Sequence, residues 1–262
     1  MTDYLRFDEL TSKSIEELHV DNGVGTLSEK YLHVFLKNYF EPIKECHEVK
    51  VGRFTADICN GNHITEIQTR NLSALRDKLE YYMLEGYDVT VVHPIPRIRK
   101  ILHVDSESGE IVRKYTYSHV GNYFDAIPEL YKIKYFLDWD KLNVRLMLFD
   151  IEEYRELKGG GFTKTGRPKR RRSTRLERIP FAIGDSLILD NPADYLEFVP
   201  EGLPKEFTSK DFAKCAKVPL DIARMSLNIL SYLGTVEHIA NDGKKYIYRL
   251  NRYFDIDFGD NC

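Results

Sequence analysis

The chain has 262 residues, of which 42% are hydrophobic and 30% are charged, so it is long enough for one large domain or two ordinary ones with buried cores. The amino-terminal stretch is acidic and polar, which argues against a signal peptide, and no run approaches the roughly 18 apolar residues of a membrane-spanning helix. Four scattered cysteines without a CxxC pair argue against a zinc site or a disulfide framework, so we expect a cytoplasmic protein that does not engage a membrane.

The formal net charge of -3 is unevenly distributed along the chain. Residues 164–178 contain eight Lys or Arg and one acid, a local charge of +7, which leaves -10 for all other residues. Like charges packed this closely repel one another and resist burial, and a run of three glycines precedes them at 159–161. We therefore predict a flexible basic linker at 158–180 that separates a first domain at 1–157 from a second at 181–262.

Hydrophobic spacing and turn residues predict alternating helices and strands before this linker. The expected elements are, in chain order, a helix at 28–40, strands at 47–51, 53–59 and 63–69, a helix at 73–86, a strand at 88–95 ended by prolines, a hairpin at 101–117, a helix near 122–136 and a strand at 143–151. Gly86 is the expected stop of the second helix, and its Arg76 and Lys78 are expected on a solvated face, although both could reach a phosphate. This order predicts an α/β fold with a mixed central sheet flanked by helices.

The hairpin at 53–69 carries polar side chains where a core would favour apolar ones. If the Asn-Gly pair at 60–61 forms a type I′ turn, Asp57 faces Ile64, and Glu66 and Gln68 share the face of Asp57. Diagonal neighbours lie about 7 to 8 Å apart, close enough for two carboxylates to converge on one cation. Oxygen ligands suit Mg²⁺ or Mn²⁺, ions that support phosphodiester cleavage. The alternative is a solvent-facing hairpin side, on which acids alternate with apolar residues.

The spacing of these acids resembles that of the PD-(D/E)XK, or restriction-endonuclease-like, nuclease superfamily. Asp57 is followed after eight residues by the sequence Glu-Ile-Gln at 66–68, and a helix precedes and follows the hairpin. The resemblance implies that Asp57 and Glu66 bind Mg²⁺ or Mn²⁺, that Gln68 takes the place of the lysine that orients or activates water, and that Glu29 is the supporting acid of the first helix. Glu29 also fits a helix-capping box.

Two departures from the superfamily pattern bear on activity. Ala56 stands where the superfamily has proline, a tolerated variation, and Gln68 stands where it has lysine. Glutamine can hydrogen-bond a water but carries no charge and cannot take up a proton at neutral pH. Two functions follow: a Mg²⁺-dependent DNA nuclease, or a non-catalytic DNA-binding regulator on a nuclease-derived scaffold. A protein-interaction adaptor is a third. Many nucleases of this fold dimerise to cut both strands, so a homodimer is also open.

The basic segment resembles the core of an AT-hook, because it contains the tripeptide Gly-Arg-Pro at 166–168. In that family an extended arm lies in the minor groove, where the negative potential attracts guanidinium groups. The candidate DNA contacts here are Arg167, Lys169, Arg170, Arg171 and Arg172. The alternative is a basic linker that is merely disordered.

Residues 203–250 resemble a winged helix-turn-helix, which would make the second domain a smaller α+β winged-helix domain. A helix capped at Thr208 is followed by a longer one at 219–233 and by a hairpin around 242–243. The resemblance implies that the second helix enters the major groove and that the hairpin touches the DNA backbone. The candidate contacts are Arg224 and Asn228 on the helix and Lys244 and Lys245 on the hairpin. Residues 201–262 hold nine basic and nine acidic residues, so a dimerisation or protein-docking role remains open.

Overall fold

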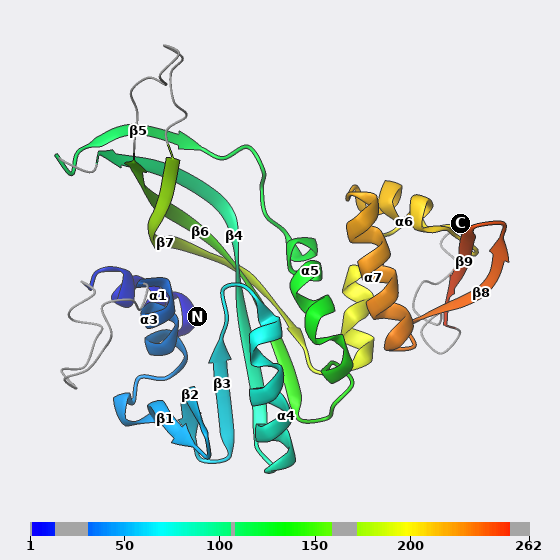
Figure 1. Cartoon of the computed structure of the whole chain (residues 1–262), viewed down its shortest axis with the longest axis horizontal. Helices are drawn as coiled ribbons and strands as arrows, with labels where there is room; N and C mark the ends of the chain where they lie inside the picture. Colours follow the sequence, from blue (N-terminus) through cyan, green and yellow to red (C-terminus); the bar gives the residue numbers. More distant parts are fainter. Residues whose placement is uncertain (1, 14–30, 106–107, 159–171, 252–262) are drawn as a thin grey trace, which may run out of the picture. The chain divides into compact units, whose positions relative to one another are not determined.

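The computed structural model describes residues 2–13, 31–105, 108–158 and 172–251 (Figure 1). The chain packs as two compact units, each built from three segments. Unit 1 comprises Met1–His47, Pro94–Asn122 and Met147–Asp185. Unit 2 comprises Glu48–His93, Tyr123–Leu146 and Ser186–Cys262.

The described elements alternate between helices and strands over most of the chain. The helices are α1 (Thr2–Thr11), α3 (Tyr31–Phe40), α4 (Arg76–Leu84), α5 (Ile127–Leu130), α6 (Ser209–Ala216) and α7 (Leu220–Tyr232), with short 3-10 turns η1 (Lys44–Cys46), η2 (Leu72–Leu75), η3 (Tyr123–Ala126), η4 (Tyr131–Phe136) and η5 (Pro192–Phe198). The strands are β1 (His47–Val51), β2 (Phe54–Asn60), β3 (His63–Ile67), β4 (Asp88–Asp105), β5 (Ile111–Thr116), β6 (Leu142–Lys158), β7 (Arg172–Leu189), β8 (Val236–Asp242) and β9 (Lys245–Leu250). None of the helices in these ranges is long and apolar enough to cross a membrane.

Seven strands form one mixed sheet. Its order is β1-β2-β3-β4-β6-β7, with β5 paired to β4. The pairs β2–β3 and β4–β5 are antiparallel, whereas β3 and β4 run parallel and are joined by a connection that contains α4. The predicted α/β class with a mixed sheet and flanking helices is therefore confirmed at this level. The strands β4, β6 and β7 each continue from one unit into the other.

The core of unit 2 around the hairpin forms because β3 and β4 are apolar on both faces and α4 has one apolar stripe. Buried side chains come from β3, from β4 and from α4: Ile64, Ile67, Val89, Val91, Val92, Leu79, Tyr82 and Met83. A parallel pair of strands covered on both faces is typical of an α/β sheet. The helix ends where expected, because Gly86 adopts a φ of 97°, a conformation that glycine reaches without steric cost.

The prediction that the strand beginning at residue 88 ends at its prolines is wrong. β4 runs through Pro94 and Pro96 as far as Asp105. Proline supplies no N–H to a ladder, so it is tolerated where the pairing is irregular. The pairing of this stretch is irregular, since Ile98 donates its backbone N–H to the Asp150 side chain at 3.1 Å.

The predicted linker also differs from the structure over its second half. Residues 172–180 belong to β7, which lies next to β6 in the sheet, whereas residues 159–171 lie outside the described ranges. The basic residues of this part are compatible with a strand because Arg178 pairs with the buried Glu153 at 2.9 Å. The local charge density predicted that these residues are solvated. That prediction fails at Arg178, because its charge is neutralised by Glu153, which lies 25 residues earlier in the sequence.

The elements expected at residues 203–250 are present. The Thr208 side chain accepts hydrogen bonds from the backbone N–H groups of Lys210 and Asp211, and the Asp211 carboxylate accepts one from the Thr208 N–H. This capping box begins α6, as predicted. The helix α7 follows, and β8 and β9 form a separate two-stranded sheet.

Candidate functional site

The β2–β3 hairpin turns one residue later than the sequence predicts. Asn60 pairs with His63, so the two loop residues are 61 and 62 and not 60 and 61. Gly61 adopts a φ of 59°, in the left-handed region that a tight turn requires. The Asn-Gly pair therefore indicated the hairpin correctly but not the position of its loop.

The shifted turn moves Asp57 to a different partner. The observed pairs join Ile58 to Thr65, Cys59 to Ile64 and Asn60 to His63. Extending this register by one residue puts Asp57 opposite Glu66, whose carboxyl group feels the charge of Asp57. The predicted pairing with Ile64 is wrong. Because the register moves by two positions, side-chain alternation still puts the two acids on one face. Directly opposite residues have Cβ atoms only about 4.5–5.5 Å apart, closer than the expected diagonal arrangement.

Glu66 is buried although it carries a carboxyl group. Its exposed fraction is 1%, because both faces of β3 are covered. Asp57 is half-buried, and its Oδ2 accepts a hydrogen bond of 2.7 Å from the Ile67 backbone N–H. The alternative of a solvent-facing hairpin side is thus wrong for Glu66, which has no open surface on which to hydrate its charge.

Lys78 on α4 supplies the positive partner of this carboxylate. Its ammonium group donates to both Glu66 oxygens, at 2.9 and 3.0 Å, and to the Thr55 carbonyl at 2.7 Å. The Lys78 side chain is 24% exposed, so it reaches from the surface of the helix into the site. The expectation that Lys78 lies on a solvated face is wrong. Arg76 is also engaged, since its Nε donates to the Lys132 carbonyl at 2.6 Å.

Tyr82, one helical turn after Lys78, lies on the same side of α4. It is fully buried, and its hydroxyl lies beside the Glu66 carboxyl group. Burial, and then the nearby Glu66 carboxylate, raise the pKa of this hydroxyl. The phenol therefore stays protonated, and its hydrogen is placed to stabilise the ionised form of Glu66.

The two acids and the lysine set an unusual protonation state. Burial, followed by the negative charge of Asp57, raises the pKa of Glu66 from its usual 4.5 to about 7, and Lys78 opposes this rise. Glu66 consequently holds its proton to a higher pH than a solvated glutamate does. A second positive charge near the pair would drive off this proton, so the geometry favours uptake of a cation.

Gln68 and Glu29 are the other two predicted catalytic residues. The Gln68 side chain donates from Nε2 to the Asn71 carbonyl at 3.2 Å, and its backbone carbonyl contacts the buried His93 ring nitrogen at 2.6 Å. Gln68 thus helps to build the turn that leads to η2. Glu29 and its predicted capping box lie outside the described residues. The structure brings together Asp57 and Glu66 of the predicted residues.

Lys78 and Tyr82 were missed as site residues by sequence reasoning, although a signal for them exists. Leu75, Leu79 and Tyr82 mark the apolar stripe of α4, and Lys78 stands four residues before Tyr82, so it borders that stripe. A lysine at the border of a buried stripe can reach under the helix with its aliphatic stem. Such a lysine can pair with a carboxylate on the sheet below.

The donor set fits a divalent cation in part. Among the described residues, no group of three or more His, Cys, Asp or Glu side chains is arranged to hold a metal. Mg²⁺ commonly binds through one or two carboxylates and completes its shell with waters and substrate phosphates. The Asp57 and Glu66 carboxyl groups meet that minimum of one or two carboxylates.

The predicted DNA contacts are spread over two regions. Arg167, Lys169, Arg170 and Arg171 lie outside the described residues, and Arg172 is the first residue of β7. Arg224 and Asn228 are exposed on α7, but the Asn228 Oδ1 already accepts a hydrogen bond of 2.5 Å from Lys134 of η4. Lys244 and Lys245 are exposed where β8 meets β9, and Lys245 pairs with Asp242 at 3.6 Å.

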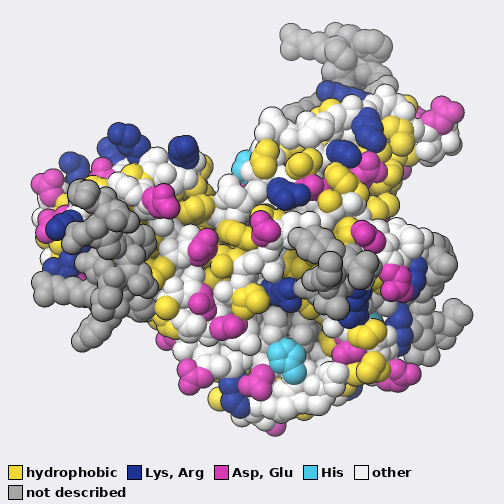
Figure 2. All heavy atoms as spheres, turned by 180° about the vertical axis from the view of Figure 1, so that it is seen from behind, with side chains coloured by type: hydrophobic (Ala, Val, Ile, Leu, Met, Phe, Trp, Pro, Cys, Tyr) yellow, Lys and Arg dark blue, Asp and Glu magenta, His cyan; other side chains and the backbone are white. Residues whose placement is uncertain are grey.

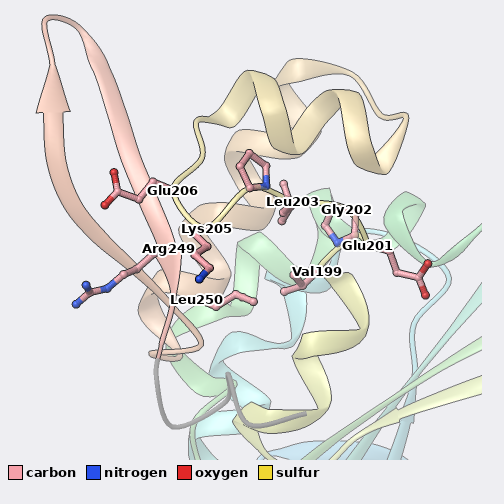
Figure 3. A pocket seen from close by; sticks show the side chains of 10 residues that line it. Val199, Glu201, Gly202, Leu203, Lys205, Glu206, Arg249 and Leu250 are labelled. Atoms are coloured by element: carbon pink, nitrogen blue, oxygen red, sulfur yellow. The ribbon is translucent and has the colours of Figure 1, made fainter. Parts of the chain in front are cut away.

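A pocket in unit 2 lies apart from the hairpin and is a second candidate site. On the face shown in Figure 2, basic and acidic side chains are interspersed. The pocket, of about 440 Å³, is lined by residues 199–206, 249 and 250. In Figure 3 the charged ends of Glu201, Glu206 and Arg249 spread apart around it. These groups do not converge on one reacting centre.

Comparison with known proteins gives a family but no named relative. No curated protein and no solved structure matches the chain. Residues 30–190 match a family model described as "Domain of unknown function (DUF8091)". The matched region contains the hairpin, α4 and the whole seven-stranded sheet, and it leaves α6 to β9 outside. Because the match covers more than half of the chain, the protein belongs to the DUF8091 family.

Proposed function

We propose that the protein is a Mg²⁺- or Mn²⁺-dependent nuclease that hydrolyses phosphodiester bonds of DNA. The observation that carries this proposal is the facing pair of Asp57 and Glu66, of which one member is buried with its pKa raised to about 7. Burying a carboxyl group costs free energy, so such perturbed groups concentrate at functional sites. Asp57 and Glu66 are the residues that would hold the ion.

A bound divalent cation supplies polarisation of the phosphate and a lowered pKa of bound water. In the overall reaction a water oxygen bonds to phosphorus and one ester P–O bond breaks, which yields a phosphate monoester and a hydroxyl group. Lys78 provides the positive charge that Gln68 lacks, because its ammonium group already lies 2.9 Å from Glu66. The Gln68 amide contributes a hydrogen bond to the attacking water only if its bond to the Asn71 carbonyl opens.

Retention of DNA is assigned to the parts of the chain beyond the hairpin. The basic arm with Arg167, Lys169, Arg170, Arg171 and Arg172 neutralises phosphates and gives affinity that depends on salt and little on sequence. A winged helix formed by α6, α7 and the β8–β9 hairpin contributes Arg224, Lys244 and Lys245. Asn228 contributes only if its bond to Lys134 opens.

A second candidate function is a non-catalytic DNA-binding regulator. It is favoured by the two hydrogen bonds from Lys78 to Glu66, which already neutralise the buried carboxylate without a metal. It is also favoured by Gln68, whose side chain is bonded to the Asn71 carbonyl. This regulator would bind DNA in EDTA and would tolerate Asp57→Asn.

Cleavage of plasmid and single-stranded DNA with Mg²⁺ or Mn²⁺ tests the nuclease directly. Asp57→Asn and Glu66→Gln are each expected to lower cleavage at least a hundredfold. Glu80→Gln is the matched control, because Glu80 is an exposed acid on α4. Equal cleavage by all four proteins would remove the enzymatic proposal, and DNA binding without any cleavage would support the regulator.

A further inference from the structure

Unit 1 contains a buried carboxylate surrounded by arginines, and none of the predicted functions uses it. Glu153 of β6 has an exposed fraction of 0%. Arg155 lies 2.6 Å from its Oε1, whereas Arg178 and Arg99 lie 2.9 and 3.9 Å from its Oε2. Three strands, β4, β6 and β7, thus each bring an arginine to one acid.

Further arginines act electrostatically on this cluster. Arg175 adds repulsion at Arg178, and Arg113 and Arg155 both act on the buried His103. Burial, followed by the charge of Arg175, lowers the pKa of the Arg178 guanidinium despite its pairing with Glu153. Glu177 contributes a second carboxylate, which accepts the Arg178 backbone N–H at 2.9 Å. At Glu153 itself, three arginines therefore share one carboxylate.

Tyr115 of β5 and Tyr117, which directly follows this strand, extend the cluster with exposed rings. The Arg99 guanidinium lies over the Tyr117 ring at 4.1 Å, and the Arg113 guanidinium lies over the Tyr115 ring at 4.7 Å. Tyr115 and Tyr117 are 38% and 43% exposed. Every residue of β5 is exposed, although an edge strand with apolar side chains is usually protected.

We propose that the arginines 99, 113, 155, 175 and 178, together with Tyr115 and Tyr117, form a binding surface for single-stranded nucleic acid. The inference rests on the proposed function for the class of partner, and it adds a contact surface that lies within unit 1. A polyanion relieves the repulsion among the arginines, because each phosphate supplies the charge that Glu153 cannot supply to all of them.

The tyrosines select the single-stranded form. In a duplex the bases are stacked inside, so only phosphates and sugars meet a flat sheet surface. Unpaired bases can stack on aromatic rings and guanidinium planes, and surfaces for single strands combine such rings with a basic track. The arrangement of Arg113 with Tyr115 and of Arg99 with Tyr117 provides both groups side by side. The surface also continues in sequence into the basic arm through Arg175 and Arg172.

The charge part of the proposal is tested by fluorescence anisotropy of the full chain with a labelled 20-nucleotide oligo(dT) in EDTA. Arg113→Gln combined with Arg175→Gln avoids the Glu153 ion pairs, so the fold should persist, which thermal melting by circular dichroism checks. We expect at least a roughly fivefold loss of affinity and a salt slope smaller by about 1.4, about 0.7 per lost phosphate contact. Lys50→Gln with Arg53→Gln is the matched control, since Arg53 also lies over a ring, that of Phe54.

The stacking part is tested with Tyr117→Leu, and Tyr135→Leu is its control because Tyr135 is 64% exposed in unit 2. We expect Tyr117→Leu to weaken oligo(dT) binding about fivefold or more and to leave binding of a 20-base-pair duplex nearly unchanged. Equal losses on both DNAs, or no loss on either, would overturn the assignment to single strands. Arginine variants that behave as their control would overturn the surface itself.

The outcome is independent of catalysis. The anisotropy is measured in EDTA, so the result does not depend on metal binding or cleavage. If no DNA is cleaved but binding depends on Arg113 and Tyr117, the nuclease proposal fails and this surface stands. If the wild type does not bind oligo(dT), this inference fails, whereas cleavage of plasmid would still support the nuclease.

Discussion

At the scale of single residues, the burial of the Glu66 carboxyl group is the feature that most needs a physical explanation. A fully covered carboxyl group opposite a second acid has lost its hydration and meets a like charge. One lysine offsets this cost in part, and a proton offsets the remainder near neutral pH. Under the proposed function a metal ion competes with this proton for Glu66, and three predictions at the residue scale follow from that competition.

Metal affinity should depend on pH through Glu66. Below a pKa of about 7 the ion must displace a proton, so affinity for Mn²⁺ should rise about tenfold per pH unit between pH 5 and 7 and then level off. Isothermal titration calorimetry in two buffers of different ionisation enthalpy would also detect the released proton. Affinity that is constant from pH 5 to pH 8 would contradict this exchange.

Stability without metal should show the opposite trend with pH. The folded-state pKa of Glu66 lies above its unfolded value, so the folded state binds the proton more tightly, and its contribution to stability is lost as pH rises from about 4.5 to about 7. The loss is on the order of 3 kcal/mol, at about 1.36 kcal/mol per pKa unit. Urea unfolding in EDTA of wild type and Glu66→Gln measures it, and the difference between the two proteins should change across this window. A difference that does not vary with pH would refute the assignment.

Lys78→Met should separate the structural role of the lysine from its role in cleavage. Without metal the variant leaves Glu66 without its cationic partner, so we expect a loss of about 1–3 kcal/mol at pH 8 and a smaller loss at pH 5, where Glu66 is protonated. Saturating Mn²⁺ should restore much of the stability but leave cleavage at least tenfold reduced. Full cleavage by a stable Lys78→Met protein would exclude Lys78 from the chemistry.

At the scale of elements, the hairpin and α4 together build the site, and the sequence predicted them unequally. Alternation and the Asn-Gly signal indicated the hairpin and the shared face of Asp57 and Glu66, because a two-residue shift preserves which face a side chain takes. The register of the hairpin depends on which two residues form its loop. The two possible loops differ in local energy, and composition does not reveal which one is lower. The contact of Lys78 depended on the packing of α4 over β3, which is tertiary information.

Gly86→Ala should destabilise the end of α4. The φ of 97° is strained for any residue with a Cβ atom, while the space around the added methyl is open apart from Lys141 Nζ at 3.7 Å. The cost is therefore one of backbone conformation, about 1–2 kcal/mol. Urea unfolding measures this change in the free energy of unfolding. Ala74→Gly in η2 is the control for an exchange between alanine and glycine at another position. A variant as stable as the wild type would show that this helix end can adopt another conformation.

At the scale of the whole molecule, the boundary drawn from charge did not coincide with the boundaries of packing. The run of arginines predicted a linker up to residue 180, but β7 begins at Arg172, and the family match extends to residue 190. Two units that share the strands β4, β6 and β7 cannot be recognised from composition, because their segments alternate along the chain. The fold class was predictable from the order of elements, and the partition into units was not.

Neutralising the basic arm should weaken DNA binding without abolishing the fold. Replacing the five Lys and Arg residues at 164, 167, 169, 170 and 171 with glutamine keeps the chain length and removes charge only. If all five contact phosphates, the slope of log affinity against log salt for duplex DNA should fall by about 4.5, at about 0.9 per contact. Anisotropy titrations from 50 to 300 mM salt (about a sixfold range) measure this slope. An unchanged slope would remove the arm from the DNA interface.

The central claim is that the facing acids of the β2–β3 hairpin bind a divalent cation. The most direct measurement is an anomalous difference map from crystals soaked in Mn²⁺, recorded for the wild type and for Asp57→Asn. We predict one peak within about 2.1 Å of carboxylate oxygens of both Asp57 and Glu66, with Lys78 displaced from at least one Glu66 oxygen, and no such peak in the variant. A wild-type map without density between these carboxylates, in which Lys78 still bonds both Glu66 oxygens, would contradict the claim.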